Sequence, residues 1–317
     1  MRIVFHIGYH KTGTSWLQSR YFAAHPSICM ANDAQAPWDD AFLESLIGCS
    51  DRKFDPDRSR NLLLRKVESA MATKTTAEVA VVSAERLSGH PFSGGYDSFR
   101  IAERIHACAP EAMILCVVRN QLDMILSVYR QLVSEGLAAS FDDLLNVKHW
   151  KGVGFDLGFY EYDFLIDKYW SLFGKEHVCA LPYEQMRHDK EAFLGTLCKF
   201  IGVRNIEIKD TRIVNRSLGD CAIRGARFFN HFRRSELNPN PLIAVNAHFL
   251  HQIIRGMDVV TRRFGCSSNL LSEENIRNFA KLYEGSNSRL MQQTGINYKI
   301  DAAKSVPRMV LEKVSLS

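Results

Sequence analysis

The fold is decided by the stretch Ile3-Val4-Phe5-His6-Ile7-Gly8-Tyr9-His10-Lys11-Thr12-Gly13-Thr14-Ser15-Trp16-Leu17. Its mostly apolar beginning predicts a short buried strand, and an amphipathic helix is expected from Thr14 to Ala23. The loop between them is bounded by Gly8 and Gly13, which supply the backbone freedom of a tight turn. Such a loop directs several backbone N–H groups and a helix start at one point. The stretch therefore predicts a strand, an anion-binding loop and a helix.

Apolar, β-rich runs recur along the first two thirds of the chain. They predict strands at Ile3–Ile7, Glu78–Ser83, Met113–Val118 and His177–Leu181, with a weaker candidate at Ser27–Met30. The intervening segments have helical periodicity, and the predicted helices are Thr14–Ala23, Arg58–Ala72, Asp97–Cys108, Leu122–Glu135, Tyr162–Phe173 and Asp189–Ile201. This alternation predicts an α/β fold of three layers, with helices on both faces of a mostly parallel sheet.

The strand signals end at about Asn205. The rest of the chain predicts helices at Asp220–Phe232, Leu242–Arg255 and Glu273–Gln292. No Gly/Pro/Ser-rich linker precedes them. We expect one domain over residues 1–317, with an α/β core at 1–205 and a mainly helical part at 206–317 packed on the sheet.

Composition limits the classes of function. The chain has 317 residues, 46% of them hydrophobic, and a net charge of +5 that is dispersed, which favours a local anion site over a nucleic-acid surface. Its eight cysteines form no CxxC pair and are expected to be reduced thiols. The chain begins with a strand rather than a signal peptide, and no apolar run approaches the roughly 20 residues of a membrane span. These features predict a cytoplasmic protein, and no histidine grouping predicts a metal site.

The loop departs from the nucleotide-triphosphatase pattern GxxxxGK[ST]. Gly8 and Gly13 fit that pattern, but Thr14 stands where the lysine belongs and Ser15 follows it. The lysine lies inside the loop, at Lys11. Because the triphosphatase lysine reaches the terminal phosphates, this relocation argues against ordinary ATP or GTP hydrolysis. A plain turn with an exposed lysine is the alternative, although two glycines, a lysine and two hydroxyls rarely converge without an anion.

Two further segments place chemistry at the carboxyl edge of the predicted sheet. The strand Met113–Val118 ends in Arg119, and Ser127 lies about two turns into the helix that follows. Both side chains can converge on one phosphate, although each alone could be an ordinary surface residue. The strand before Glu85 places that carboxylate at the same edge, where it could take a proton from an acceptor hydroxyl. His90 is the second candidate for this base, and a salt bridge of Glu85 to Arg86 or Arg104 is the alternative.

The segment Tyr9–Trp16 resembles the 5′-phosphosulfate loop of sulfotransferases that use 3′-phosphoadenosine 5′-phosphosulfate (PAPS), of the bacterial, carbohydrate-modifying type. The resemblance implies a P-loop-like fold without a metal ion. It also implies that Lys11 contacts the bridging oxygen and the 5′-phosphate. By the same resemblance, the phosphate is bound by Thr12, Gly13, Thr14 and Ser15, and Trp16 packs near the adenine.

Later segments extend this resemblance over roughly residues 1 to 220. Arg119 and Ser127 have the spacing of the family's 3′-phosphate motif. Tyr183 resembles the tyrosine that the family places near the adenine, and Glu184 after it could cap a helix. Arg216, in Asn215-Arg216-Ser217, resembles a residue that some bacterial members place near the nucleotide. The position of Glu85 is similar to that of the glutamate base in carbohydrate- and protein-modifying members.

The resulting prediction is a sulfotransferase that uses PAPS and releases adenosine 3′,5′-bisphosphate. The acceptor implied by the resemblance is a carbohydrate or glycolipid, and aromatic residues in Trp150–Tyr162 could line its site or simply form core. Two alternatives remain. A P-loop kinase would fit the sheet pattern, and a non-catalytic nucleotide-binding protein would leave Glu85 without a role.

Overall fold

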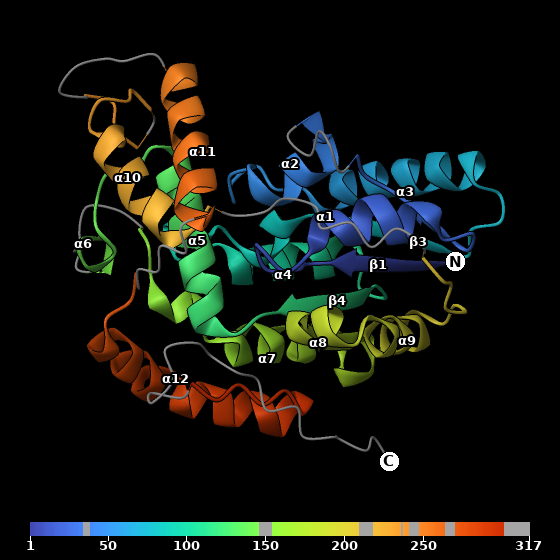
Figure 1. Ribbon diagram of the computed structural model, residues 1–317. Coiled ribbons are helices and arrows are strands. Elements are labelled where there is room, and N and C mark those ends of the chain that lie inside the picture. Colours follow the sequence, from blue (N-terminus) through green and yellow to red (C-terminus); the bar gives the residue numbers. More distant parts are fainter. Residues whose placement is uncertain are drawn as a thin grey trace.

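The computed structural model describes residues 1–33, 39–145, 154–208, 218–235, 237–240, 247–263 and 270–300. Within these ranges one parallel sheet has the order β2-β3-β1-β4-β5 (Figure 1). Its strands are β1 (Arg2–His6), β2 (Ile28–Met30), β3 (Val79–Ser83), β4 (Met113–Val118) and β5 (Val178–Pro182). All the predicted strands are confirmed, including the weak one at β2.

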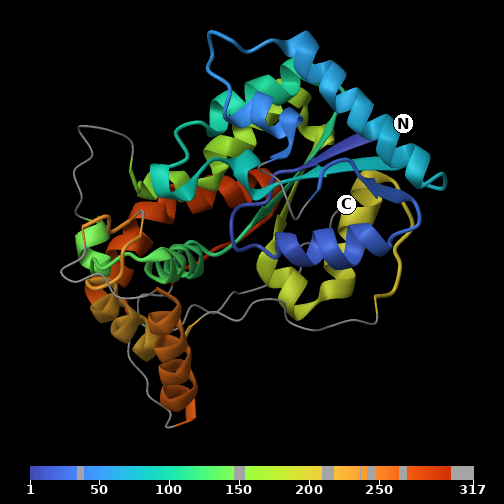
Figure 2. The same ribbon diagram turned by 90° about the horizontal axis from the view of Figure 1, so that it is seen from above.

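Helices cover both faces of the sheet. Because side chains alternate along a strand, Phe5 faces one layer of helices while Val4 and His6 face the other. The first layer contains α3 (Pro56–Thr73), α4 (Ser98–Cys108) and α7 (Tyr162–Phe173), and the second contains α1 (Thr14–Trp16), η1 (Leu17–Phe22) and α9 (Lys190–Ile201). Figure 2 shows the strands passing between these two layers. The predicted three-layer α/β fold is confirmed.

Local sequence signals explain where the covering helices begin and end. Asp55 accepts a hydrogen bond from the backbone N–H of Arg58 at 3.0 Å, and Pro56 occupies the first turn of α3. Asp189 caps α9 in the same way, and Gly202, with φ of 73°, ends it.

The helix after the phosphate loop differs from the expectation. We predicted a regular helix over Thr14–Ala23, but α1 ends at Trp16 and continues as the π-helical segment η1. A π-helical turn is wider than an α-helical turn and holds more residues. Such turns are frequent at functional sites. Gln18, in η1, donates a hydrogen bond from Nε2 to the carbonyl oxygen of Ser83 at 2.8 Å and so joins the helix to the end of β3.

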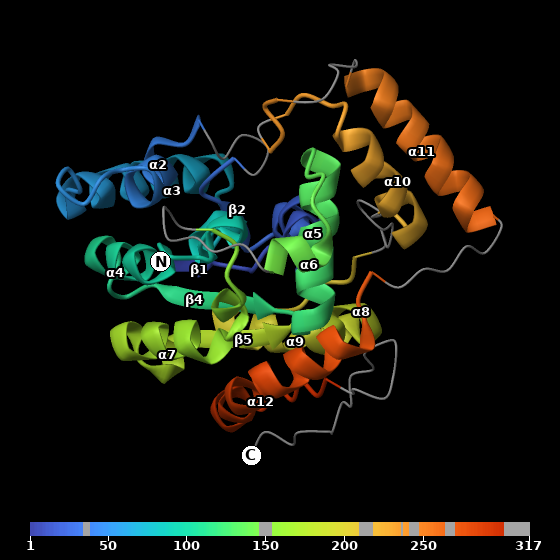
Figure 3. The ribbon, with the colours of Figure 1, turned by 90° about the vertical axis from the view of Figure 1, so that its left-hand side faces the viewer.

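The helices of the last third pack against the core elements α5 (Gln121–Glu135) and α7. Figures 1 and 3 show α10 (Asp220–Asn230) beside α5, α11 (Ala247–Arg263) alongside α10, and α12 (Glu273–Thr294) along α7. Arg289 of α12 forms an ion pair of 2.6 Å with the buried Asp163 of α7. The helix predicted at Leu242–Arg255 extends to Arg263, and residues 241–246 lie outside the described ranges.

The cysteine expectation requires one correction. Six cysteines are free thiols, but Cys221 in α10 is disulfide-bonded, so the prediction of eight reduced thiols is wrong for this residue. The absence of a CxxC pair carried no information on a bond between distant cysteines. None of the helices in the described ranges is long and apolar enough to span a membrane.

Candidate active site

The candidate site lies where the neighbouring strands β1 and β4 end. The chain leaves β1 into α1 on one face of the sheet and leaves β4 into α5 on the other face. Connections that diverge in this way open a crevice at the carboxyl ends of the strands, the usual ligand position in open α/β sheets. Lys11 follows β1 and Arg119 follows β4, so the two predicted phosphate ligands flank this crevice.

The phosphate loop has a constrained backbone. Lys11 has φ of 65°, the one positive φ found at a non-glycine residue in the described ranges, and Gly13 has φ of 83°. Residues other than glycine adopt a positive φ at an energetic cost, and such backbone strain is concentrated at functional sites. Thr12 fixes the turn by donating a hydrogen bond from Oγ1 to the carbonyl oxygen of Tyr9 at 2.5 Å. The Lys11 side chain is exposed.

Arg119 connects residues from three separate motifs. Its Nη1 donates a hydrogen bond to the carbonyl oxygen of Lys11 at 3.2 Å, and its guanidinium carbon lies 5.1 Å from the ring centre of Tyr183. Tyr183 also packs against the loop, because a Cβ on Gly13 would lie 3.1 Å from its Cε2 atom. The structure thus brings Lys11, Gly13, Arg119 and Tyr183 together. Ser127 lies further along α5 and is half-buried.

Two further residues, Trp16 and Arg216, were predicted as nucleotide ligands. Trp16 is buried in the helical layer, where its ring stacks on Tyr21 at 6.3 Å and lies beneath the Lys190 ammonium at 4.3 Å. These contacts give it a packing role, and a contact with adenine stays a prediction. Arg216 lies outside the described residues.

Glu184, which the sequence suggested only as a helix cap, supports the arginine. Its Oε1 accepts a hydrogen bond from the backbone N–H of Asn120 at 2.9 Å, and its Oε2 accepts one from the Tyr298 hydroxyl at 2.9 Å. Burial raises the pKa of the Glu184 carboxyl, and these two donors oppose that rise. The carboxyl fixes the main chain directly after Arg119. The pair Tyr183-Glu184 was predicted from the sequence, but the contact with Tyr298 was not.

Glu85 begins the short helix η3 (Glu85–Ser88) directly after β3. Burial raises the pKa of its half-buried carboxyl, while the Lys11 charge and the Thr14 hydroxyl act in the opposite direction. Its two alternative partners are engaged elsewhere: Arg86 pairs with Asp97 at 2.6 Å, and Arg104 pairs with an aspartate on another loop at 2.6 Å. No described residue forms an ion pair with Glu85.

A cavity of about 250 Å³ opens beside this carboxyl. Its lining combines polar and apolar side chains from the loop, the strand end and α2 (Ala41–Ile47), and includes Ser15, Leu43, Ile47, Glu85 and Arg86. His90 is not part of this lining; its ring packs against Phe92 at 5.1 Å and lies 6.4 Å from that of His10. Glu85 therefore lines the cavity, whereas His90 does not.

Several buried polar atoms around the loop lack protein partners. Arg119 Nε forms no hydrogen bond with any described residue, and Thr14 Oγ1 forms none of good geometry although it stands near Glu85. Buried donors and acceptors are normally paired, so these atoms fit a ligand that carries anionic oxygens. No group of three or more His, Cys, Asp or Glu side chains suited to a metal ion occurs within the described ranges.

The aromatic residues considered for an acceptor site are mainly core. Phe159 and Tyr162 are buried, and their rings lie 5.0 and 4.7 Å from the ring of Tyr9 in the phosphate loop. These two rings pack against Tyr9 of the loop and do not line the cavity. Trp150 lies outside the described part of the chain.

Comparison with known proteins places this site in a family. The model of the sulfotransferase family matches residues 4–207. No curated protein sequence gives a match. Similar solved structures include a sulfotransferase from Alicyclobacillus acidocaldarius, with 24% identity, coverage of 68% of this chain and 87% of that chain, and a TM-score of 0.48. The sulfotransferase domain from the curacin biosynthetic pathway has 13% identity, coverage of 81% and 96%, and a TM-score of 0.41.

A third similar structure is that of mouse sulfotransferase SULT7A1 complexed with PAP, with 14% identity, coverage of 93% and 86%, and a TM-score of 0.36. The family match spans well over half of the 317 residues and includes the loop, Glu85, Arg119 and Tyr183. The chain belongs to the sulfotransferase family.

Proposed function

We propose that this protein transfers a sulfuryl group from PAPS to a hydroxyl group of an acceptor. The observation that carries the proposal is the convergence of Lys11, Arg119 and Tyr183 at one crevice, next to a cavity that contains Glu85. One group of residues can hold a nucleotide with two phosphate-bearing ends, and the adjoining cavity offers a base. Membership in the sulfotransferase family supports this assignment.

The donor would be held from both ends. Lys11, Thr12, Gly13, Thr14 and Ser15 bind the 5′-phosphosulfate through loop N–H groups, hydroxyls and the ammonium. Arg119 and Ser127 bind the 3′-phosphate. Residues near the adenine are Tyr183 and Trp16, with Arg216 as a further nucleotide contact.

The reaction is a direct in-line transfer. Glu85 takes the proton of the acceptor hydroxyl while that oxygen attacks sulfur. The donor supplies the sulfuryl group, whose bond to the 5′-phosphate oxygen breaks with its electron pair left on that oxygen. Lys11 neutralises the charge that develops on this leaving oxygen. The raised pKa of Glu85 makes its carboxylate a stronger base than an exposed one.

The acceptor is proposed to be a carbohydrate or a glycolipid. The cavity is small, about 250 Å³, so it would admit the part of the acceptor that carries the reacting hydroxyl and leave the remainder outside. The lining combines polar groups with Leu43 and Ile47, which suits a sugar, whose surface has both hydroxyl groups and apolar C–H groups.

We propose the cytoplasm as the site of action. The six free cysteines support a reducing compartment, whereas the disulfide at Cys221 is unusual there. Counting free thiols in protein isolated under conditions that block thiol exchange would decide between these observations. A disulfide present in every molecule would argue for an oxidising compartment.

Calorimetric titration with nucleotides tests the donor assignment. Adenosine 3′,5′-bisphosphate should bind well, and AMP and ATP poorly, because only the bisphosphate carries the 3′-phosphate. Hydrogen bonds to charged groups contribute about 1.5–3 kcal/mol, so Arg119→Ala should weaken the bisphosphate roughly ten- to a hundred-fold and leave AMP nearly unchanged. Arg187→Ala, at an exposed arginine of α8 (Tyr183–His188), is the matched control. Equal affinity of the wild-type protein for AMP and the bisphosphate would overturn the proposal.

A further inference from the structure

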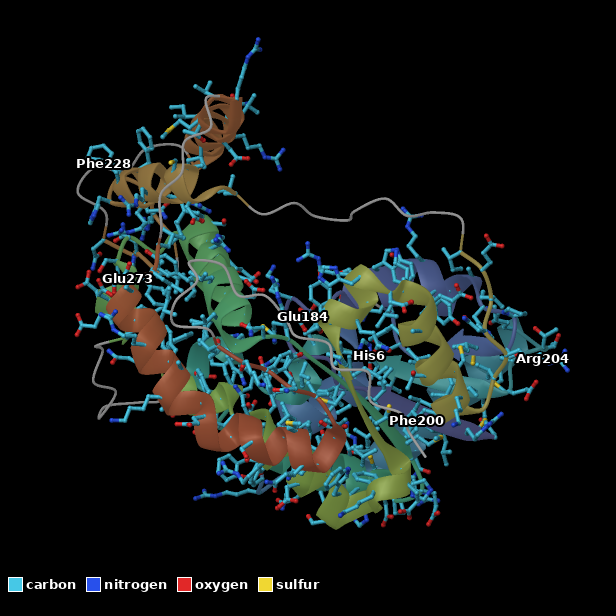
Figure 4. The ribbon with its side chains drawn as sticks, turned by 60° about the horizontal axis from the view of Figure 1, so that its bottom comes forward. His6, Glu184, Phe200, Arg204, Phe228 and Glu273 are labelled. Carbon is cyan, nitrogen blue, oxygen red and sulfur yellow. The ribbon has the colours of Figure 1, made fainter. Side chains whose placement is uncertain are left out.

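A chain of hydrogen bonds runs behind the phosphate loop and ends at His6. The Nε2 atom of Gln18 donates to both the carbonyl oxygen and the Oγ of Ser83, at 2.8 and 3.0 Å. Ser83 Oγ in turn lies 2.7 Å from Nδ1 of His6. Asn32 anchors the same serine through its main chain, with hydrogen bonds of 2.8 and 3.0 Å. Figure 4 marks His6 inside the body of the protein, and its side chain is fully buried.

These contacts determine which nitrogen of His6 carries the proton. The carbonyl oxygen of Ser83 only accepts, so the amide nitrogen of Gln18 must face it and also donates to the serine Oγ. Ser83 is then free to donate its own hydroxyl proton to His6 Nδ1. If His6 Nδ1 instead donated to Ser83 Oγ, the serine proton would have no acceptor among the described residues and His6 Nε2 would have no donor. These hydrogen bonds therefore set the tautomer that carries its hydrogen on Nε2. Burial lowers the pKa of His6 to about 3, so the ring is neutral.

The protonated nitrogen faces the inner side of the phosphate loop. The position that a Cβ on Gly8 would occupy lies 2.8 Å from His6 Nε2 and 3.1 Å from each of Thr12 Oγ1 and Thr14 Oγ1. A side chain at position 8 would therefore collide with three hydrogen-bonding atoms, and glycine lets the loop backbone pack close to them. His6 Nε2 is buried and has no partner among the described residues. An unpaired buried donor is costly, so this nitrogen would gain from a hydrogen-bond acceptor bound at the loop.

We propose that His6 is an additional ligand of the oxyanion held on the loop, donating a neutral N–H from Nε2 to a phosphate oxygen beside the Gly8 backbone. A neutral donor adds a hydrogen bond without adding charge beside Lys11. Ser83 and Gln18 are positioning residues, since they act by fixing the tautomer. This inference rests on the proposed function only in the identity of the anion.

Nitrogen-15 NMR of the intact protein tests the tautomer directly. Spectra of the free protein should show His6 protonated at Nε2 and unprotonated at Nδ1 near neutral pH. Addition of adenosine 3′,5′-bisphosphate should shift the Nε2–H resonance, whereas adenosine 3′-monophosphate, which lacks the 5′-phosphate, should leave it in place. Protonation at Nδ1, or an unchanged Nε2–H resonance in protein saturated with the bisphosphate, would overturn the proposal.

Variants provide a second measurement. The double variant His6→Leu/Ser83→Ala removes both partners of the His6–Ser83 hydrogen bond, and Gln18 Nε2 keeps its hydrogen bond to the carbonyl oxygen of residue 83, so the fold should survive. Its affinity for adenosine 3′,5′-bisphosphate should fall about ten- to a hundred-fold, with unchanged affinity for adenosine 3′-monophosphate. His6→Gln, which restores an N–H donor, should recover part of the loss. His188→Gln, at an exposed histidine, is the control.

The outcomes separate this inference from the function on which it rests. Wild-type protein that binds no bisphosphate would refute the donor assignment. Wild-type protein that binds it, with the double variant equally tight, would refute the role of His6 alone. A parallel loss for both nucleotides would show that His6 serves the fold and not the 5′-phosphate. If the double variant fails to fold, the tautomer and the ligand-induced shift in the wild-type protein still decide.

Discussion

Arg119 Nη1 donates a hydrogen bond to the carbonyl oxygen of Lys11 at 3.2 Å, and this bond joins the end of β4 to the loop after β1. The two residues belong to motifs separated by more than a hundred positions. The residue proposed for the 3′-phosphate thus also contacts the main chain of the loop proposed to bind the 5′ end.

Lys11→Ala should lower turnover at saturating donor more than it changes the acceptor KM. The ammonium lies where charge develops on the leaving oxygen, and an interaction made chiefly in the transition state affects kcat. Steady-state kinetics measure both parameters, with Lys53→Ala, at an exposed lysine, as the control. Wild-type turnover in the Lys11 variant would show that the lysine is not at the reacting centre.

Glu85→Gln should reduce turnover by roughly 10²- to 10⁴-fold, the usual contribution of a general base, and keep the affinity for adenosine 3′,5′-bisphosphate. Glutamine retains the shape of the side chain but cannot take the proton. Glu111→Gln is a suitable control, because Glu111 is exposed and precedes β4 at the opposite edge of the sheet. A fully active variant would transfer the role to His90 or to the acceptor itself.

The activity of the wild-type enzyme should fall as the pH is lowered through the raised pKa of Glu85. The carboxylate is the active form, and burial moves its pKa upward, so protonation inactivates the enzyme at a higher pH than an exposed glutamate would require. A kcat profile against pH measures this acidic limb. The limb should persist in His90→Asn, and its disappearance there would assign the titration to His90.

Activity should survive exhaustive treatment with EDTA, since Lys11 and Arg119 neutralise phosphate charge in the proposed transfer and Glu85 accepts the proton. Assays with and without added Mg²⁺ test this. Loss of activity on chelation, with recovery by magnesium, would favour the P-loop kinase alternative.

Most of the sheet and of the loop could be predicted from sequence because their signals are local. Buried parallel strands are continuous apolar runs, and even β2, with three residues, was visible as a weak run. The π-helical segment from Leu17 was not predictable, because its pattern of apolar residues is also that of an α-helix. The disulfide at Cys221 and the contact of Tyr298 with Glu184 depend on residues distant in sequence, which periodicity does not report.

For the site, residue types predicted which residues belong to it, and the structure showed which of those residues contact one another. Lys11, Arg119 and Tyr183 were predicted from three motifs, but nothing in the sequence indicated that Arg119 would contact both others. The position of His6 beside the loop allows a phosphate contact, ranked below that of Lys11, but its hydrogen bond to Ser83 required the pairing of β1 with β3.

Tyr298→Phe should lower both stability and donor affinity, although Tyr298 follows the last helix and lies far in sequence from every motif. Its hydroxyl donates to Glu184 Oε2, and Oε1 of the same carboxyl holds the backbone N–H of Asn120, next to Arg119. Loss of a hydrogen bond to a buried charged group costs about 1.5–3 kcal/mol of unfolding free energy. Displacement of Arg119 should weaken adenosine 3′,5′-bisphosphate and leave AMP unchanged.

The pH dependence of this variant gives the sharper test. Burial raises the folded-state pKa of Glu184, so the carboxyl contributes stability below its ordinary pKa that is lost as the pH rises through the raised value. The Tyr298 hydroxyl opposes that loss by stabilising the charged form. The stability difference between wild type and Tyr298→Phe should therefore be largest above the raised pKa and should shrink as the pH falls and the carboxyl is protonated. Chemical denaturation at several pH values measures it, with Tyr96→Phe, at an exposed tyrosine, as the control. A difference that does not vary with pH would mean that Tyr298 contributes by packing alone, and that its hydrogen bond to Glu184 does not support the arginine.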